Sequence, residues 1–462
     1  MGINFSPFEI GQRALRASQL GLTVAGQNIA NVNTPGYTRQ EVQLAAAPPS
    51  GANPRLTGNG VTIEDVRSFR DQFIETRLQT ESGISGRLQA KRDTLESLDA
   101  ALNPASNNIT TTLTDFFGAF RTLEANPTSV PLRTVAIESG KALGNAFNST
   151  RARLEEIRAN TDGLLRIDVE EANQLAGRIA SLTASISVAE NTGAKASELR
   201  DQRSQAIQSL TELTGTRTTE NEDGTLTLTL ADGRPLVLAD RASTLQTSST
   251  APNGLATITL DGQPATINSG RVRGLQESIG LISSQITGLD ELAAAVATRV
   301  NTAHLSGVDL DGNAGTTFFA VPNGGAPITA ANLAVSASVS ANPRRVVSAA
   351  AGAGNGDGSV ARNIAELLSD NSSQAGTRTG SFSSIYGSLV SEAGQAIKTN
   401  EDALVTQQAI LAQVTAQREA ASGVSLDEEA VNLLRYQRAF EAAARLLKVA
   451  DEITQTVIAL GQ

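Results

Sequence analysis

The spacing of apolar residues predicts a long helix at the C-terminal end of the chain. Between Gly423 and Leu460, apolar residues recur at alternating steps of three and four, which is the spacing of a coiled-coil seam. Ser425 and Glu428 fit a capping box at the start of this helix. The seam residues are Tyr436, Ala439, Ala443, Leu446, Ala450, Ile453, Val457 and Leu460.

The same spacing predicts a second helix near the start of the chain. Ser6 and Pro7 mark its beginning, and Asn33 to Gly36 end it, because the residue before a proline avoids the helical region. Its seam residues are Phe8, Gly11, Leu15, Ser18, Leu22, Ala25, Ile29 and Val32. We therefore expect the two ends of the chain to pair with each other.

The apolar face of the C-terminal helix is wider than one partner helix covers. Leu434, Phe440, Leu447 and Ile458 lie beside the seam. Because helices gain most of their stability by packing such a face, we hypothesise that both ends are frayed in the free subunit and fold when neighbouring subunits cover them. An intramolecular hairpin that only closes the fold is the alternative. The predicted assembly interface comprises Phe8, Leu15, Leu22, Ile29, Val32, Leu433, Tyr436, Phe440, Leu446, Leu447, Ile453, Val457 and Leu460.

The pattern between the two ends predicts a multidomain α+β protein that is mainly α-helical. Helical periodicity indicates a helix bundle, and period-two alternation with Asp-Gly turns predicts a small inserted β-domain at the outer tip. The expected boundaries are 1–37 and 424–462 for a terminal coiled-coil domain, 38–63 for a linker with short extended pieces, 64–215, 271–305 and 359–423 for the helical rod domain, 216–270 for the β-domain, and 306–358 for a loop and β region packed on the rod.

Composition narrows the class of protein. A formal net charge of −10 over 462 residues argues against nucleic acid as a main partner, because phosphate binding needs clustered Lys and Arg. The chain has no cysteine, so it offers neither disulfides nor thiolate metal ligands. It shows no signal-peptide pattern at its start and no run of apolar residues long enough to span a membrane. These facts alone indicate a cytoplasmic protein.

The sequence contains only weak candidates for a metal-binding or catalytic site. Asp309-Leu310-Asp311-Gly312-Asn313 begins like a calcium loop, but its glycine falls one position early and Ala320 stands where a bidentate Glu is needed. His304 is the only histidine, and we expect it to have a structural role at a helix end. We therefore predict no catalytic residue, no metal site, no cofactor and no enzymatic activity.

Two motifs resemble a known family. The C-terminal run from Ser422 to Ile453 strongly resembles the C-terminus of flagellar hook-associated proteins. The N-terminal motif, which extends from Asn28 to Arg39, resembles one shared by flagellar rod, hook and hook-associated proteins. The N-terminal motif indicates only the superfamily of flagellar rod, hook and hook-associated proteins. The C-terminal run narrows the resemblance to hook-associated proteins. The motif residues are Asn28, Asn31, Thr34, Pro35, Gly36, Tyr37, Ser425, Leu426, Asp427, Glu428 and Glu429.

The resemblance implies a structural protein of the bacterial flagellum that forms a ring at the hook-filament junction. It also implies secretion to the extracellular flagellum by type III export without a cleaved signal peptide, in place of a cytoplasmic location. The implied partners are further copies of the chain, hook protein, the second hook-associated protein and an export chaperone on the C-terminal helix. Another rod or hook protein is the alternative, and an extracellular enzyme is the alternative from a different class.

Overall fold

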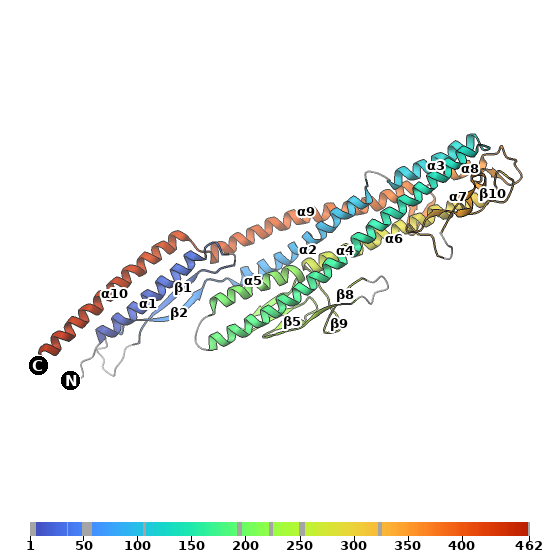
Figure 1. Ribbon diagram of the computed structural model, residues 1–462. Helices are drawn as coiled ribbons and strands as arrows, with labels where there is room; N and C mark the ends of the chain where they lie inside the picture. Colours follow the sequence, from blue (N-terminus) through green and yellow to red (C-terminus); the bar gives the residue numbers. More distant parts are fainter. Residues whose placement is uncertain are drawn as a thin grey trace.

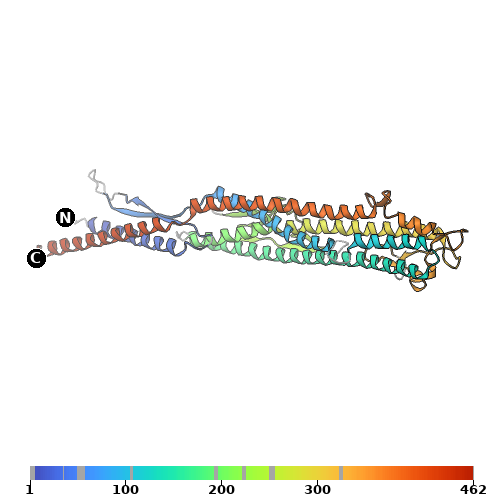
Figure 2. The same cartoon turned by 90° about the horizontal axis from the view of Figure 1, so that it is seen from above.

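The molecule is a long rod with its two termini at one end (Figures 1 and 2). The computed structural model describes residues 6–34, 36–48, 58–104, 108–191, 196–220, 225–248, 255–321 and 326–460. Both views show long helices running side by side along the rod axis, with the terminal helices continuing beyond them. The fold is mainly helical with small sheets, as the sequence predicts.

The terminal region consists of a helix pair and a β-hairpin. Helix α1 (Ser6–Ala30) runs against α10 (Leu426–Leu460), and strands β1 (Gln40–Ala46) and β2 (Val61–Ser68) pair antiparallel beside α1. The segment 38–63, expected to be a linker, thus contributes most of this hairpin. Its second strand continues to Ser68, and helix α2 begins at Gln72, later than the expected start of the helical domain at residue 64.

The rod is a bundle of helices whose apolar faces point inward. Its members are α2 (Gln72–Leu102), α3 (Ile109–Ala125), α4 (Val130–Asn191), α5 (Ser197–Thr214), α6 (Gly270–Leu305) and α9 (Phe382–Ser422). Helix α4 has 62 residues and is therefore about 93 Å long. Tyr386 of α9 donates a hydrogen bond to the Leu102 carbonyl, and Asn400 donates to the Leu88 carbonyl, so polar contacts fix the register of α9 against α2.

The inserted β-domain lies along the side of the rod, and its expected position at the outer tip is wrong (Figure 1). Leu228 and Val237 are fully buried in a core shared with Leu165 and Val169 of α4, so the sheets must cover that helix. One sheet contains β3 (Arg217–Glu220), β4 (Leu226–Thr229), β5 (Pro235–Leu238) and β6 (Arg241–Ala242), and the other contains β7 (Leu245–Ser248), β8 (Thr257–Leu260) and β9 (Gln263–Pro264).

Short elements close the end of the rod that lies far from the termini (Figure 1). They pack around buried aromatic rings, among which Phe116 lies 5.0 Å from Phe117 and 5.5 Å from Phe318 between ring centroids. The elements are β10 (Gly307–Val308), β11 (Phe319–Ala320), β12 (Ala334–Val335), α7 (Ala337–Ala341), the 3-10 helix Pro343–Arg345, β13 (Ala349–Ala350), α8 (Ser359–Glu366), β14 (Ser373–Ala375) and β15 (Arg378–Gly380).

His304 and Asp309 both serve this end of the rod structurally. The fully buried His304 ring donates from Nδ1 to the Thr316 carbonyl and accepts at Nε2 from the Val347 N–H at 2.9 Å. The Asp309 carboxylate accepts the Asn313 N–H at 2.8 Å and so closes its own turn. In the part of the chain that the structure describes, no group of three His, Cys, Asp or Glu residues could hold a metal ion. No helix within the described ranges is long and apolar enough to cross a membrane.

We predict that the stability of the far end depends on pH through His304. Burial lowers the pKa of His304 from 6.5 to about 4, so between these values the unfolded chain binds a proton that the folded chain does not. The free energy of unfolding should therefore fall as pH decreases through this window, by roughly 3 kcal/mol when fully developed. Urea titrations between pH 7 and pH 4 should show a smaller fall for His304→Gln than for the parent chain. Equal pH dependence would contradict this role.

Candidate assembly interface

Helices α1 and α10 pack closely because small residues face large ones. A side-chain carbon added at Gly21 would lie 2.5 Å from the Tyr436 ring, and one at Gly11 would lie 3.0 Å from Leu447. The contact also buries Ala443 and Ala450 of α10. The helices run antiparallel, since Gly11 faces Leu447 while Gly21 faces Tyr436. Ala17, Ser18, Val24 and Ala25 of α1 are also buried, between α10 on one side and the hairpin on the other.

The structure divides the predicted α10 seam into a covered line and an uncovered one. Tyr436, Ala443 and Ala450 face α1, and the neighbouring Phe440 and Leu447 are half-buried. Leu446, Ile453 and Val457 remain 39, 58 and 47% exposed. The exposed residues that continue this line are Val431, Ala439, Ala442 and Val449, and we call the full line from Val431 to Val457 the uncovered stripe. The side chain of Leu460 lies outside the described residues.

The other predicted interface residues are only partly accessible. Leu15, Leu22, Ile29, Val32 and Leu433 are half-buried. Phe8 at the start of α1 is 46% exposed. The structure therefore brings the two predicted sets together, but α1 covers only one side of the α10 apolar face. The uncovered stripe therefore remains accessible to solvent.

The N-terminal motif forms a turn that is held by the Asn28 side chain. Asn28 is fully buried; its amide nitrogen donates to the Gln40 carbonyl at 2.8 Å, and its oxygen accepts from the Gln40 N–H at 3.1 Å and the Tyr37 hydroxyl at 2.9 Å. Thr34 donates to the Asn31 side chain at 3.1 Å. Gly36 has φ +82, a backbone conformation that favours glycine. Pro35 lies outside the described residues.

The C-terminal motif is connected to this turn by Arg39, the last residue of the N-terminal motif, whose ion pairs the sequence did not predict. Its guanidinium contacts Glu428 at 2.8 Å and Glu429 at 2.9 Å, and the Glu429 side chain is only 3% exposed. Glu428 therefore pairs with Arg39, whereas the predicted capping box directs it to the backbone of Ser425. Ser425 accepts the Glu428 N–H at 3.5 Å, and Leu426 and Asp427 are exposed.

A second group of contacts joins the terminal region to the rod. Asp201 of α5 accepts from the Thr38 N–H at 3.2 Å, the Thr38 hydroxyl at 3.0 Å and Arg70 at 2.6 Å. Arg418 of α9 pairs with Glu75 at 2.7 Å and donates to the Gly36 carbonyl at 3.1 Å. Together with Arg39, these residues fix the terminal helices to the rod. They are far apart in sequence, so no local pattern indicates their meeting.

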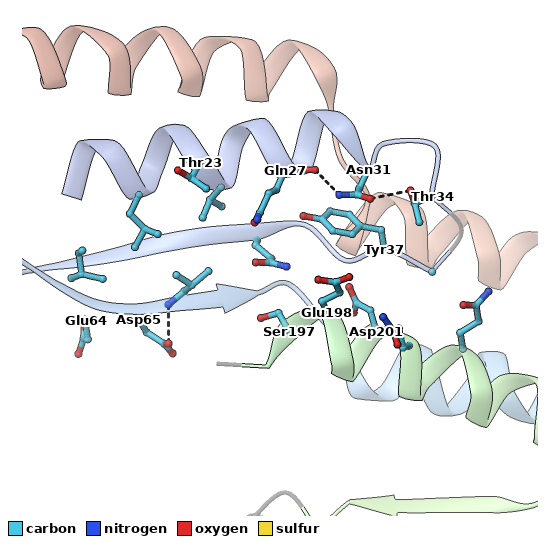
Figure 3. A pocket seen from close by; sticks show the side chains of 18 residues that line it. Thr23, Gln27, Asn31, Thr34, Tyr37, Glu64, Asp65, Ser197, Glu198 and Asp201 are labelled. Atoms are coloured by element: carbon cyan, nitrogen blue, oxygen red, sulfur yellow. Dashed lines mark hydrogen bonds between the residues drawn. The ribbon is translucent and has the colours of Figure 1, made fainter. Parts of the chain in front are cut away.

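An acidic groove of about 720 Å³ lies at this junction between α1, β2 and α5 (Figure 3). Glu198 and Asp201 project from α5 toward Tyr37, and Glu64 and Asp65 come from the hairpin. Burial, with the nearby charges of Asp201, Glu429 and Glu198, raises the pKa of Tyr37 to about 12. Burial also raises the pKa of Asp201, against the opposing effect of Arg70. The phenol therefore stays neutral and keeps its bond to Asn28 at physiological pH.

We predict that Arg39→Ala loosens the terminal helices without unfolding the rod. The substitution leaves the buried Glu429 carboxylate without its partner, which costs about 3 kcal/mol or more for a buried pair. Amide exchange should accelerate in α1 and α10 and stay unchanged in α4.

Arg344→Ala is the matched control, because it breaks an exposed pair with Asp311 at the other end of the rod. Solvent screens such an exposed pair, so its loss should affect stability little and exchange in α1 and α10 should not change. Unaltered exchange of α10 in Arg39→Ala would contradict the structural importance of this pair.

Comparisons with known proteins agree with this architecture. The family model for the helical domain of flagellar hook-associated protein FlgK matches residues 95–319. Models for the C-terminal region of flagellar basal body rod FlgEFG proteins and for flagella basal body rod proteins match residues 416–460 and 8–38. The three matches therefore fall on the rod and on the two terminal helices.

Individual relatives are similar over nearly the whole chain. The chain is 27% identical to flagellar hook-associated protein 1 of Escherichia coli K12, over 96% of this chain and 97% of that protein. It is 28% identical to the Bacillus subtilis protein of the same name, over 99% of this chain and 98% of that protein. The flagellar hook junction protein FlgK of Burkholderia pseudomallei has the same fold, with a TM-score of 0.66, 14% identity and coverage of 75% of this chain and 100% of that chain. The chain belongs to the family of flagellar hook-associated proteins.

Proposed function

We propose that the chain forms the ring at the hook-filament junction by assembling with copies of itself through its terminal helices. The observation that carries this proposal is the uncovered stripe on α10, where Leu446, Ile453 and Val457 stay exposed beside the line that α1 covers. A folded monomer gains nothing from the parts of these side chains that stay exposed. A neighbouring subunit that buries them gains on the order of 1 kcal/mol per side chain.

The charged contacts at the junction support a mechanical role for the rod. Arg39, Asp201 and Arg418 fix the terminal helix pair to α5, α9 and the hairpin, so a contact made by the terminal helices also orients the rod. In the assembly, the helices would form a shared inner layer, and the rods would adapt the outer contacts between hook and filament. Hydrophobic burial supplies the stability, and the seam register supplies the specificity.

The further proposed partners follow from the same surface and from the family. They are hook protein on one side of the ring, the second hook-associated protein on the other, and an export chaperone that shields α10 before secretion. The proposed location is the extracellular flagellum, reached by type III export without a cleaved signal peptide. A role as another rod or hook protein is less well supported, because the model that matches residues 95–319 describes the helical domain of the hook-associated protein.

We predict that cells without the gene build hooks but no filaments and shed filament protein into the medium. The parent gene should restore filaments, whereas a chain with Ile453→Asp and Val457→Asp should not, because the charges prevent burial of the stripe. Electron microscopy and analysis of the medium measure both results.

Gln437→Asp with Gln455→Asp is the matched control, because it adds the same two charges to exposed α10 positions outside the stripe. This variant should restore filaments. Filaments on cells without the gene would contradict the proposed function.

A truncation that lacks residues after Leu426 should lose chaperone binding, because it removes the whole apolar face of α10. Binding of the chaperone to the purified chain can be measured by calorimetry. Val405→Ser serves as the control, since it removes an apolar side chain that is 64% exposed on α9 and should leave binding intact. Undiminished binding of the truncation would refute the chaperone assignment.

A further inference from the structure

An open apolar groove of about 690 Å³ lies between the first half of α10, helix α1 and the β-hairpin. Its floor consists of small residues, and its walls include Leu44 and Val61 of the hairpin and Leu446 of α10. Leu44 and Leu446 are 43 and 39% exposed, so the side chains that line the groove leave it open to solvent. The floor residues are Ala14, Ala17, Ser18, Ala439, Ala442 and Ala443.

The shape of this groove suits an amphipathic helix. Apolar grooves bind such helices through large side chains spaced at three and four residues, and small floor residues let the helix axis come close. Along α10 the groove extends from Arg435 to Leu446, about 16 Å. An occupant therefore needs about two to three turns of helix with an uncovered apolar face.

The second half of the same α10 has such a face. Val449, Ile453 and Val457 follow one another at steps of four and are 50, 58 and 47% exposed. They span about 12 Å, which fits within the groove. Gly11 of α1 faces Leu447 of α10, and the two helices are antiparallel. Ser6, where α1 begins, therefore lies opposite about residue 451. The last turns of α10 extend beyond the start of α1 (Figures 1 and 2).

We propose that the face formed by Val449, Ile453 and Val457 of one copy occupies the groove of a second copy. This inference rests on the proposed function and identifies which surfaces meet. Groove and occupant lie on different halves of one helix, so each copy has both a groove and an occupying face. We propose that these two surfaces of one copy contact two different neighbours, which makes the contact heterologous. Contacts of this type continue from subunit to subunit and close into rings or build helical assemblies.

Charges beside the two surfaces are complementary. Glu41 and Arg435 lie at the groove. Lys448 and Glu452 directly precede Val449 and Ile453 in the chain and lie to one side of the occupying face. Within the described residues, none of these four side chains forms an ion pair, although ion pairs are common along the rod. Each charge thus has a partner of opposite sign available on the second copy.

The experiment is thiol cross-linking in assembled flagella. The chain has no cysteine, so Ala442→Cys in the groove and Ile453→Cys on the occupying face can be introduced together without background. These positions are eleven residues apart on one helix, about 16 Å, so a cross-link between them within one copy is impossible. Oxidation of flagella from cells that lack the parent gene should give a ladder of covalent oligomers, at least tenfold above the control.

The control pair is Ala442→Cys with Gln455→Cys, where the second thiol lies on α10 outside the stripe. Cells that make filaments but give no more ladder with the test pair than with this control would overturn the groove contact and leave the proposed function intact. Cross-linking of Cys at position 442 to hook protein or another component would also overturn it. Cells that make normal filaments without any copy of the gene would instead overturn the proposed function.

A second variant tests the groove without cross-linking. Ala442→Trp fills the groove from an exposed position, so it should leave the helicity of the purified chain unchanged and reduce filament restoration at least tenfold. Full restoration by this variant would contradict the proposal.

Discussion

The central physical constraint on this protein is an apolar helix face that its own chain does not cover. Helix α1 packs against Tyr436, Ala443 and Ala450, and the small residues on α1 allow the two helices to lie close together. The adjacent stripe through Leu446, Ile453 and Val457 stays open to solvent. A soluble monomer rarely keeps such a continuous apolar line unless it serves an interaction. In a family of flagellar structural proteins, the line is best understood as part of an assembly surface.

The remainder of the structure controls how this surface is presented. The terminal helices could move freely if residues 38–63 were a flexible linker, but the segment contributes a hairpin beside α1 and one wall of the groove. Arg39, Asp201 and Arg418 then connect the turn after α1 to α10, α5 and α9. The motif residues Asn28 and Tyr37 act inside this junction. Their role is therefore to fix the direction of the terminal helices relative to the rod.

Sequence reasoning could predict the elements whose signal is local. The step of three and four predicted α1 and α10, and the change to period two predicted the inserted β-domain. It could not predict that the sheets cover α4, because Leu165 and Val169 look like ordinary bundle positions until the partner surface is known. It could not predict the ion pair of Arg39 with Glu428 for the same reason, since these residues are 389 positions apart. It also treated the α10 seam as one line, whereas packing against α1 divides it in two.

Amide exchange of the free chain and of assembled flagella tests the central claim most directly. The account predicts that the amides around Leu446 and Ile453 exchange much more slowly in the flagellum than in the dilute monomer, while α4 is equally protected in both. Strong and equal protection of these α10 amides in the free monomer would contradict it, because the stripe would then need no second molecule to cover it.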